Sequence, residues 1–205
     1  MIIVKSMNDG GHFLSSTDWE GYEKILEAFD GRRVKITFDQ GALELVSPSR
    51  RHERIKKILA ELIEFACFEK GVDYFGGGST TFKRKALERG LEPDECYYFH
   101  SLDAEEEAEA LAPDLAIEVE VSRGSLDRLA IYAALGVSEI WCYSDDHKLI
   151  IHAFDSGGYS EAPASRFLPF LLPEVVSRFV QRGLERRNTR LLLMELREHL
   201  GSGPL

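Results

Sequence analysis

The chain has 205 residues, of which 44% are hydrophobic, and a formal net charge of −10. This length and composition suit one compact α/β domain, and no apolar run reaches the ~18 residues that a membrane span requires. The net negative charge argues against a protein that holds nucleic acid through bulk charge, because neutralising phosphates requires lysine and arginine. The three cysteines, Cys67, Cys96 and Cys142, fit neither a disulfide framework nor a zinc site, and indicate buried thiols in a reducing cytoplasm.

Acidic and basic residues are unevenly distributed along the chain. Five acids fall within the seven residues Asp103–Glu109, which is typical of a solvated loop or short helix. Basic residues gather elsewhere, so an acidic protein of this kind can still bind DNA locally. The two basic clusters are Arg50, Arg51, Arg54, Lys56 and Lys57, and then Lys83, Arg84 and Lys85.

The first half of the chain predicts a helix, a hairpin and a longer helix. Ser16 and Thr17, followed by acids, resemble a helix N-cap. Asp39-Gln40-Gly41 between two apolar runs is the pattern of a β-hairpin. The apolar residues from Ile55 to Ala66 recur at helical spacing, which predicts one buried stripe. The predicted elements are a helix over residues 18–29, strands over 33–38 and 42–46, and a helix from Ser47-Pro48-Ser49 to about Lys70.

The second half predicts mainly strands, followed by C-terminal helices. The segment Leu115–Val121 alternates, which places its leucine, isoleucine and valines on one face and Ala116, Glu118 and Glu120 on the other. The predicted strands cover residues 79–85, 96–99, 115–121, 139–143 and 149–154. A helix is predicted over 125–135, and the helical region after Phe167 is predicted to break near Gly183.

These elements predict an α/β fold with a mixed central sheet flanked by helices, preceded by an N-terminal helix and hairpin. The sequence contains no internal repeat and no linker long enough to divide domains. We therefore expect a single domain over residues 1–200, with an N-terminal extension and a C-terminal helix. Residues 201–205 are expected to form a frayed tail.

Four acidic residues are candidate metal ligands. Glu118 and Glu120 share a strand face, where burying an unpaired charge is costly, so they point to solvent, to a partner or to a metal. Oxygen ligands on rigid strands suit Mg²⁺ or Mn²⁺. Asp94 and Asp114 each follow a proline just ahead of a strand, where an acid could join Glu118 at one ion. A purely structural interpretation is also available, because Pro-Asp pairs often start turns and the glutamates could form a solvated strand face.

Five ordered segments resemble a known family. They are Ala42–Ser49 (ALELVSPS) with His52-Glu53 after it, Gly78–Lys83 (GSTTFK), Leu91–Tyr98 (LEPDECYY), Pro113–Glu120 (PDLAIEVE) and Leu126–Trp141 (LDRLAIYAALGVSEIW). Their order and spacing resemble the Uma-type restriction endonuclease family of the PD-(D/E)XK nuclease superfamily, over roughly Asp18 to Phe170. The resemblance implies a restriction-endonuclease-like fold and metal-dependent cleavage of DNA.

The resemblance also implies roles for particular residues. Asp94 and Glu118 match the two acids of the superfamily, and Glu120 stands where its lysine would be. The family's lysine, four residues before a tyrosine, corresponds to Arg128. Arginine stays protonated and cannot act as a general base, although it can stabilise charge on a phosphate. An acid from the first long helix often joins such sites.

Residues outside these motifs complete the predicted site. From the long helix, His52 is ranked slightly above Glu53 as a contributor, because it falls nearer the apolar stripe. Glu44 could reach the site from the hairpin, but an exposed hairpin charge is the favoured interpretation. Lys83, with Arg50 and Arg51, is predicted to contact the substrate, and a solvated basic face is the alternative.

The sequence therefore favours a Mg²⁺- or Mn²⁺-dependent endonuclease acting on DNA, with no membrane association. The expected assembly is a homodimer, and the run Leu191–Met194 offers an apolar surface for it. The main alternative is a catalytically impaired module of the same fold that binds nucleic acid or a protein, with Arg128 marking the lost chemistry. A third possibility is a metal hydrolase of a phosphoester other than nucleic acid.

Overall fold

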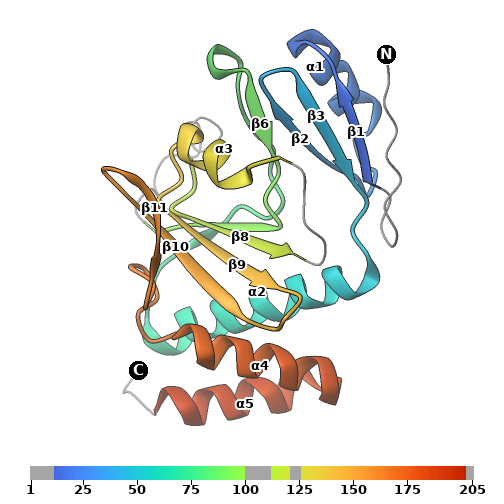
Figure 1. The fold of residues 1–205 in the computed structure, drawn as a ribbon. Coiled ribbons are helices and arrows are strands. Elements are labelled where there is room, and N and C mark those ends of the chain that lie inside the picture. Colours follow the sequence, from blue (N-terminus) through green and yellow to red (C-terminus); the bar gives the residue numbers. More distant parts are fainter. Residues whose placement is uncertain (1–11, 100–111, 121–125, 202–205) are drawn as a thin grey trace.

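The computed structural model describes residues 12–99, 112–120 and 126–201, without the side chains of residues 12–14 and of Glu120. The described strands form two sheets, and Figure 1 shows the smaller sheet standing beside one end of the larger one. The acidic stretch Asp103–Glu109, the first eleven residues, residues 121–125 and residues 202–205 lie outside the described part. In the described part, no helix is both long and apolar enough to cross a membrane.

The larger sheet has six strands in the order β11-β10-β9-β8-β7-β4. β8 and β9 pair in parallel and the other neighbours are antiparallel, so the sheet is mixed as predicted. Helix α3 (Arg128–Leu135) lies in the connection between the two parallel strands. Parallel neighbours require such a crossover, because a hairpin can join only antiparallel strands. The strands are β4 (Phe75–Gly76), β7 (Glu95–Tyr98), β8 (Leu115–Glu120), β9 (Glu139–Ser144), β10 (Leu149–Asp155) and β11 (Gly158–Ala162).

The smaller sheet is antiparallel, with the strand order β1-β3-β2-β6-β5. The predicted hairpin is its centre, and Gln40 and Gly41 both have positive φ, as a tight two-residue hairpin turn requires. Helix α1 (Trp19–Ala28) packs on this sheet through Trp19 and Tyr22. The strands are β1 (His12–Ser16), β2 (Lys35–Asp39), β3 (Ala42–Val46), β5 (Phe82–Arg84) and β6 (Arg89–Leu91), with a short 3-10 helix over Lys85–Leu87.

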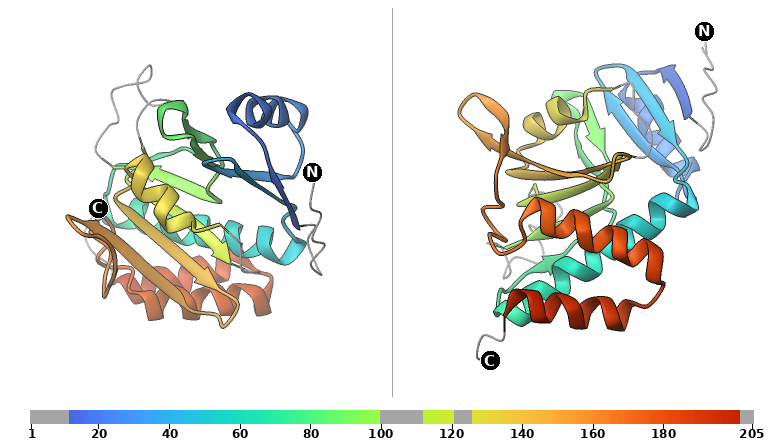
Figure 2. Two further views of the ribbon diagram at one scale, coloured as in Figure 1. Left: turned by 45° about the horizontal axis from the view of Figure 1, so that its top comes forward. Right: turned by 60° about the horizontal axis from the view of Figure 1, so that its bottom comes forward.

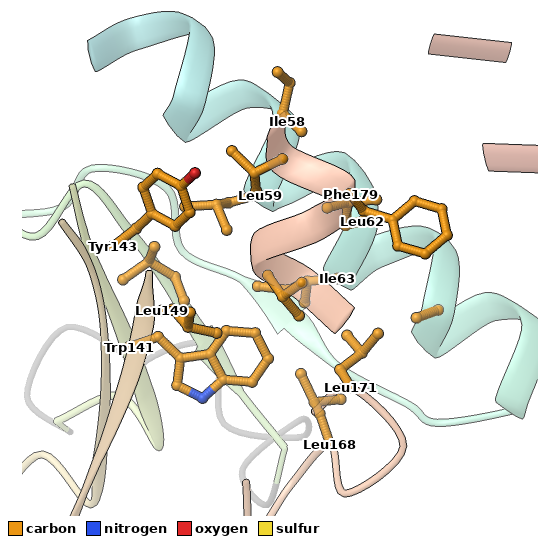
Figure 3. Close-up of a cluster of buried hydrophobic side chains, with 14 of the residues drawn as sticks. Ile58, Leu59, Leu62, Ile63, Trp141, Tyr143, Leu149, Leu168, Leu171 and Phe179 are labelled. Carbon is orange, nitrogen blue, oxygen red and sulfur yellow. The ribbon is translucent and has the colours of Figure 1, made fainter. Parts of the chain in front are cut away.

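Three helices cover one face of the larger sheet (Figures 1 and 2). Helix α2 (Arg50–Lys70) lies against the sheet, and α4 (Pro173–Arg186) and α5 (Thr189–Leu200) pack on α2. The predicted apolar stripe of α2 is buried and meets Trp141 and Tyr143 from β9, as Figure 3 shows. The other face of the sheet is covered by α3, whose Ile131 and Tyr132 are fully buried. Strand β8 therefore has helices on both of its faces.

Several sequence predictions differ from the structure. The helix break predicted near Gly183 is wrong, because α4 continues to Arg186 and the turn falls at Arg187, whose φ is 46°. Gly183 instead permits close helix packing, since a Cβ there would lie 3.0 Å from side-chain atoms of Ile58 and Leu192. Lys85 starts a 3-10 helix and does not extend the strand of Lys83. Strands β1, β4, β6 and β11 were not predicted. Strands β4 and β6 have only two and three residues, β1 pairs with the distant β3, and β11 (GYSEA) has no alternation of apolar and polar residues.

The position of α1 on the smaller sheet depends on a glycine. Gly90 pairs with Phe38, and the ring of Tyr22 stacks on Phe38 at a centroid distance of 4.8 Å. A Cβ at position 90 would overlap the Tyr22 hydroxyl and lie 2.8 Å from its ring carbon Cζ. The absence of a side chain at Gly90 therefore lets the aromatic cluster close.

We expect Gly90→Ala to lower the free energy of unfolding by about 1–3 kcal/mol, because the buried tyrosine must move to admit the methyl group. Urea denaturation measures the change. Gly157→Ala is the matched control, since its Cβ would meet nothing closer than 3.6 Å. Equal stability of the two variants would contradict this account of the packing.

Candidate functional site

Asp94 stands at the junction of strands β7 and β8. It immediately precedes β7, and its backbone N–H donates to the carbonyl of Ile117 at 3.0 Å. Its carboxylate then accepts a hydrogen bond from the backbone N–H of Val119 at 2.6 Å. Asp94 is 1% exposed. The two strands therefore hold this acid beside Glu118, the residue before Val119, as the sequence predicted for acids on adjacent strands.

Two side chains, Lys35 and His52, meet the Asp94 carboxylate. The Lys35 ammonium from β2 forms a short ion pair with Oδ1, and Nε2 of His52 from α2 lies 3.0 Å from Oδ2. Because an ionised carboxylate only accepts hydrogen bonds, Nε2 is the protonated nitrogen of His52. Burial alone would raise the pKa of Asp94, but the Lys35 charge and the His52 contact outweigh it and hold this pKa well below its usual range.

Glu118, on β8, has its own partners. Its Oε1 accepts a hydrogen bond from Nη2 of Arg128 at 2.6 Å and a short one from the Tyr132 hydroxyl. Both residues lie on α3, four positions apart, so one face of that helix serves the carboxylate. Burial raises the pKa of Glu118, and the Arg128 guanidinium opposes that shift. The Glu118 charge in turn raises the pKa of Arg128, against the effect of burial.

Arg128 also joins the two sheets. Its Nη1 donates to Oγ1 of Thr37 on β2 at 3.0 Å, and its Nη2 donates to the carbonyl of Glu92 at 3.1 Å. The guanidinium therefore contacts the smaller sheet, the loop before Asp94 and the Glu118 carboxylate. Its planar fork of donors suits this arrangement.

The hairpin turns a polar face toward the acids. Lys35, Thr37 and Glu44 are all buried, and Thr37 pairs with Glu44 across the strands, so their side chains share one face. The interpretation of Glu44 as an exposed hairpin charge is wrong, because it is 1% exposed. The smaller sheet therefore contributes charged groups to this region.

The remaining predicted ligands occupy different places. The Asp114 carboxylate accepts a hydrogen bond from the backbone N–H of Phe99 at 2.7 Å, at the start of β8, whereas Glu118 lies near the strand's end. Glu120 is the last residue of β8, and its side chain lies outside the described residues. Glu53 is half-buried and its Oε1 lies 3.4 Å from Nδ1 of His52, one contact away from Asp94. The structure thus gathers Asp94, Glu118, Arg128 and His52, and does not bring Asp114 to them.

The predicted substrate-binding cations lie on two surfaces. Arg50 and Arg51 are exposed in the first turn of α2, next to His52, and Nη2 of Arg51 lies 3.3 Å from Nε2 of His147. Lys83 is exposed on β5 and forms an ion pair with Glu23 of α1 at 3.0 Å. Lys83 therefore belongs to the outer side of the smaller sheet.

Sequence reasoning missed several residues of this cluster. Lys35, Thr37, Glu92 and Tyr132 were assigned no role, although Lys35 and Thr37 alternate with the apolar Ile36 and Phe38. That alternation was the available signal, since it puts two polar side chains on one face of a strand. Glu92 is also partly buried, which raises its pKa. Because Glu92 lies in a loop, no alternation of polar and apolar residues could have predicted that burial.

The donor set suits a hard divalent cation. Within the described ranges, no group of three or more His, Cys, Asp or Glu side chains is gathered closely enough to hold a metal ion. Mg²⁺ is commonly held by one or two carboxylates, with water and substrate phosphate completing its shell. Asp94 and Glu118 fit this pattern as two buried carboxylates on adjacent strands. The Lys35 ammonium on Asp94 takes a place that such an ion would need.

Comparison with known proteins identifies relatives of this chain. A family model described as "Putative restriction endonuclease" (Uma2) matches residues 19–185. The fold is similar to that of a solved structure from Anabaena variabilis, described as "a putative nuclease belonging to DUF820". The TM-score is 0.51 at 13% identity, over 71% of this chain and 90% of that chain. At this identity the likeness shows the fold alone. No curated protein matches the chain.

We expect Lys35→Met to lower the free energy of unfolding by about 3 kcal/mol, because it leaves a buried carboxylate without its main counter-charge. In the Asp94→Asn background the same substitution should cost much less, which a double-mutant cycle by urea denaturation measures. Lys148→Met is the control, since the Lys148–Asp146 pair is exposed and such pairs contribute about 0–1 kcal/mol. Additive effects at Lys35 and Asp94 would show that the ion pair is not energetically coupled.

Proposed function

Since the chain belongs to the Uma2 family of restriction endonuclease-like proteins, we propose that it hydrolyses DNA phosphodiester bonds with Mg²⁺ or Mn²⁺ at the Asp94–Glu118 site. The observation that carries the proposal is the placement of two buried carboxylates at neighbouring strands, beside Lys35, Arg128 and His52 from three other elements. Such a cluster is expensive to bury, and structures retain such clusters mainly at functional sites.

Asp94 and Glu118 are the proposed ligands, and Glu120 is a further candidate from the end of β8. A divalent ion held there supplies a nucleophile at neutral pH and polarises the phosphoryl oxygen. Asp94 is ready for this role because it is ionised over the whole physiological range, given its lowered pKa. Glu118 must give up any proton to bind the ion, so its raised pKa predicts that metal binding weakens as the pH falls.

The two buried cations have different parts in this proposal. The Lys35 ammonium pairs with Asp94. A divalent ion held by that carboxylate would repel the ammonium, which would then be available to contact a substrate phosphate. Arg128 remains protonated and stays on Glu118, where its guanidinium can stabilise negative charge that develops on the phosphate. In this proposal the lysine that contacts the phosphate is therefore Lys35, from the hairpin.

His52 is the proposed positioning residue for Asp94. Its Nε2–H donates to Oδ2 at 3.0 Å, while Oε1 of Glu53 lies 3.4 Å from Nδ1, a nitrogen with no hydrogen-bond partner among the described residues. The Nε2 hydrogen bond fixes the orientation of the carboxylate, as partners of the ligands do in other metal sites. His52 therefore acts through Asp94 in our proposal, and Glu53 acts through its position beside His52.

A homodimer would bring together the two sites that a double-strand cut needs. Leu191 and Met194 on α5 are 44% and 43% exposed, which leaves apolar surface on the outer helix. We include pairing through α5 in the proposal, with sedimentation of the full chain as its direct measurement.

The second candidate is a nuclease-fold module that binds nucleic acid without cutting it. The specific observation in its favour is that internal cations already satisfy both carboxylates. A protein that never takes up a metal would be stable with this arrangement.

We expect the protein to cut supercoiled DNA with Mn²⁺ or Mg²⁺ but not with EDTA. Asp94→Asn and Glu118→Gln should each lower the rate at least about 100-fold, because each removes an anionic ligand from the site. Gel-based cleavage assays measure the rate.

Glu69→Gln is the matched control for the two ligand variants. Glu69 pairs with Arg197 near the opposite end of α2, so its neutralisation should leave the rate unchanged. Cleavage that survives both ligand substitutions would sink the proposed function. Metal-independent binding of DNA with no cleavage would favour the second candidate.

A further inference from the structure

A stripe of basic residues runs along α2 from the candidate site. Arg50, Arg54 and Lys57 follow at i, i+4 and i+7, so they share one face of the helix. His52, in the same first turn, contacts Asp94 at 3.0 Å, so the stripe begins within two residues of the site but on the opposite side of the helix. The three residues span about 10 Å of helix at ~1.5 Å per residue.

The stripe continues onto the turn between α4 and α5. Nη2 of Arg54 donates to the carbonyls of Gly183 and Leu184 at 2.7 Å, which ties this turn to α2. Figures 1 and 2 show the first half of α2 and the α4–α5 connection on the same side of the molecule. A groove of about 480 Å³ separates them, and Arg54, Lys57 and Arg187 line it.

The charges of this surface are largely free to meet a ligand. Arg50, Lys57 and Arg187 are exposed, and in the part of the chain that the structure describes neither arginine forms an ion pair. The acid in the groove, Glu61, is already engaged by Lys57 at 3.7 Å and by the Thr189 hydroxyl at 3.2 Å. Positive charge therefore accumulates here although the whole chain carries −10.

We propose that this surface, formed by Arg50, Lys57 and Arg187, binds the phosphate backbone of duplex DNA. The proposal rests on the proposed function for its choice of substrate. A row of cations on rigid helices, longer than one phosphate, fits a repeating polyanion better than a small anion. Arg54 has a positioning role, because its guanidinium is committed to the carbonyls of α4.

The test is fluorescence anisotropy of the full chain with a 20-base-pair DNA duplex in EDTA, where no cutting occurs, across a salt series. Lys57→Gln and Arg187→Asn should each weaken binding several-fold and lower the slope of log Kd against log salt by about 1, because each removes one phosphate contact. Asparagine suits position 187, whose φ is 46°. The double variant should lose about 2 from the slope.

Lys24→Gln is the control, since Lys24 is an exposed lysine of α1, a helix that Figure 1 shows far from α4 and α5. Unchanged slopes in the Lys57 and Arg187 variants would overturn the proposal, as would wild-type protein that binds duplex RNA and not duplex DNA. If the wild-type chain cuts DNA while these variants bind normally, the surface is wrong and the nuclease stands. If binding depends on the surface and the wild-type chain cuts no DNA, the surface is correct and the proposed nuclease activity is wrong.

Discussion

Two buried carboxylates, each paired with a buried cation from a different element, are the constraint on which this structure depends. Lys35 reaches Asp94 from the hairpin, and Arg128 reaches Glu118 from α3. Removing a charge from water costs several kcal/mol, so each of these groups can be buried only when it is paired with an opposite charge. The two sheets meet where the polar face of the hairpin contacts this cluster, through Lys35 on Asp94 and Thr37 on Arg128. Ordinary apolar packing then surrounds the cluster on both sides of β8.

Local patterns predicted the elements, and only the folded chain reveals how the charges pair. The stripe of α2, the hairpin turn at Gln40-Gly41 and the alternation of β8 depend on neighbours in sequence, so periodicity and turn chemistry identify them. The contact between Lys35 and Asp94 joins residues 59 positions apart, and no local pattern encodes it. The burial of Glu44 was likewise not evident from its neighbours in sequence. The resemblance pointed to Asp94 and Glu118 as a pair of acids, but not to the hairpin lysine.

Arg128 and Lys35 place positive charge on the two carboxylates of the site. Arginine holds Glu118 through a planar fork and cannot release a proton at physiological pH. Lys35 places an ammonium group against Asp94 instead, from an element outside the motif. Lys35 and Arg128 offset the charges of Asp94 and Glu118, which is how these four groups can be buried together. A divalent ion bound there would disturb that balance, and the lysine, with its flexible stem and compact charge, is the partner that could move.

The most direct measurement of this account is the anomalous scattering of Mn²⁺ in crystals of the wild-type chain. We predict one ion within about 2.0–2.6 Å of oxygens from both Asp94 and Glu118, the range of hard-cation coordination. The Lys35 ammonium should have left Asp94 in the same crystals. An ion bound only elsewhere, with the lysine still paired to Asp94, would contradict the assignment of this cluster as a metal centre.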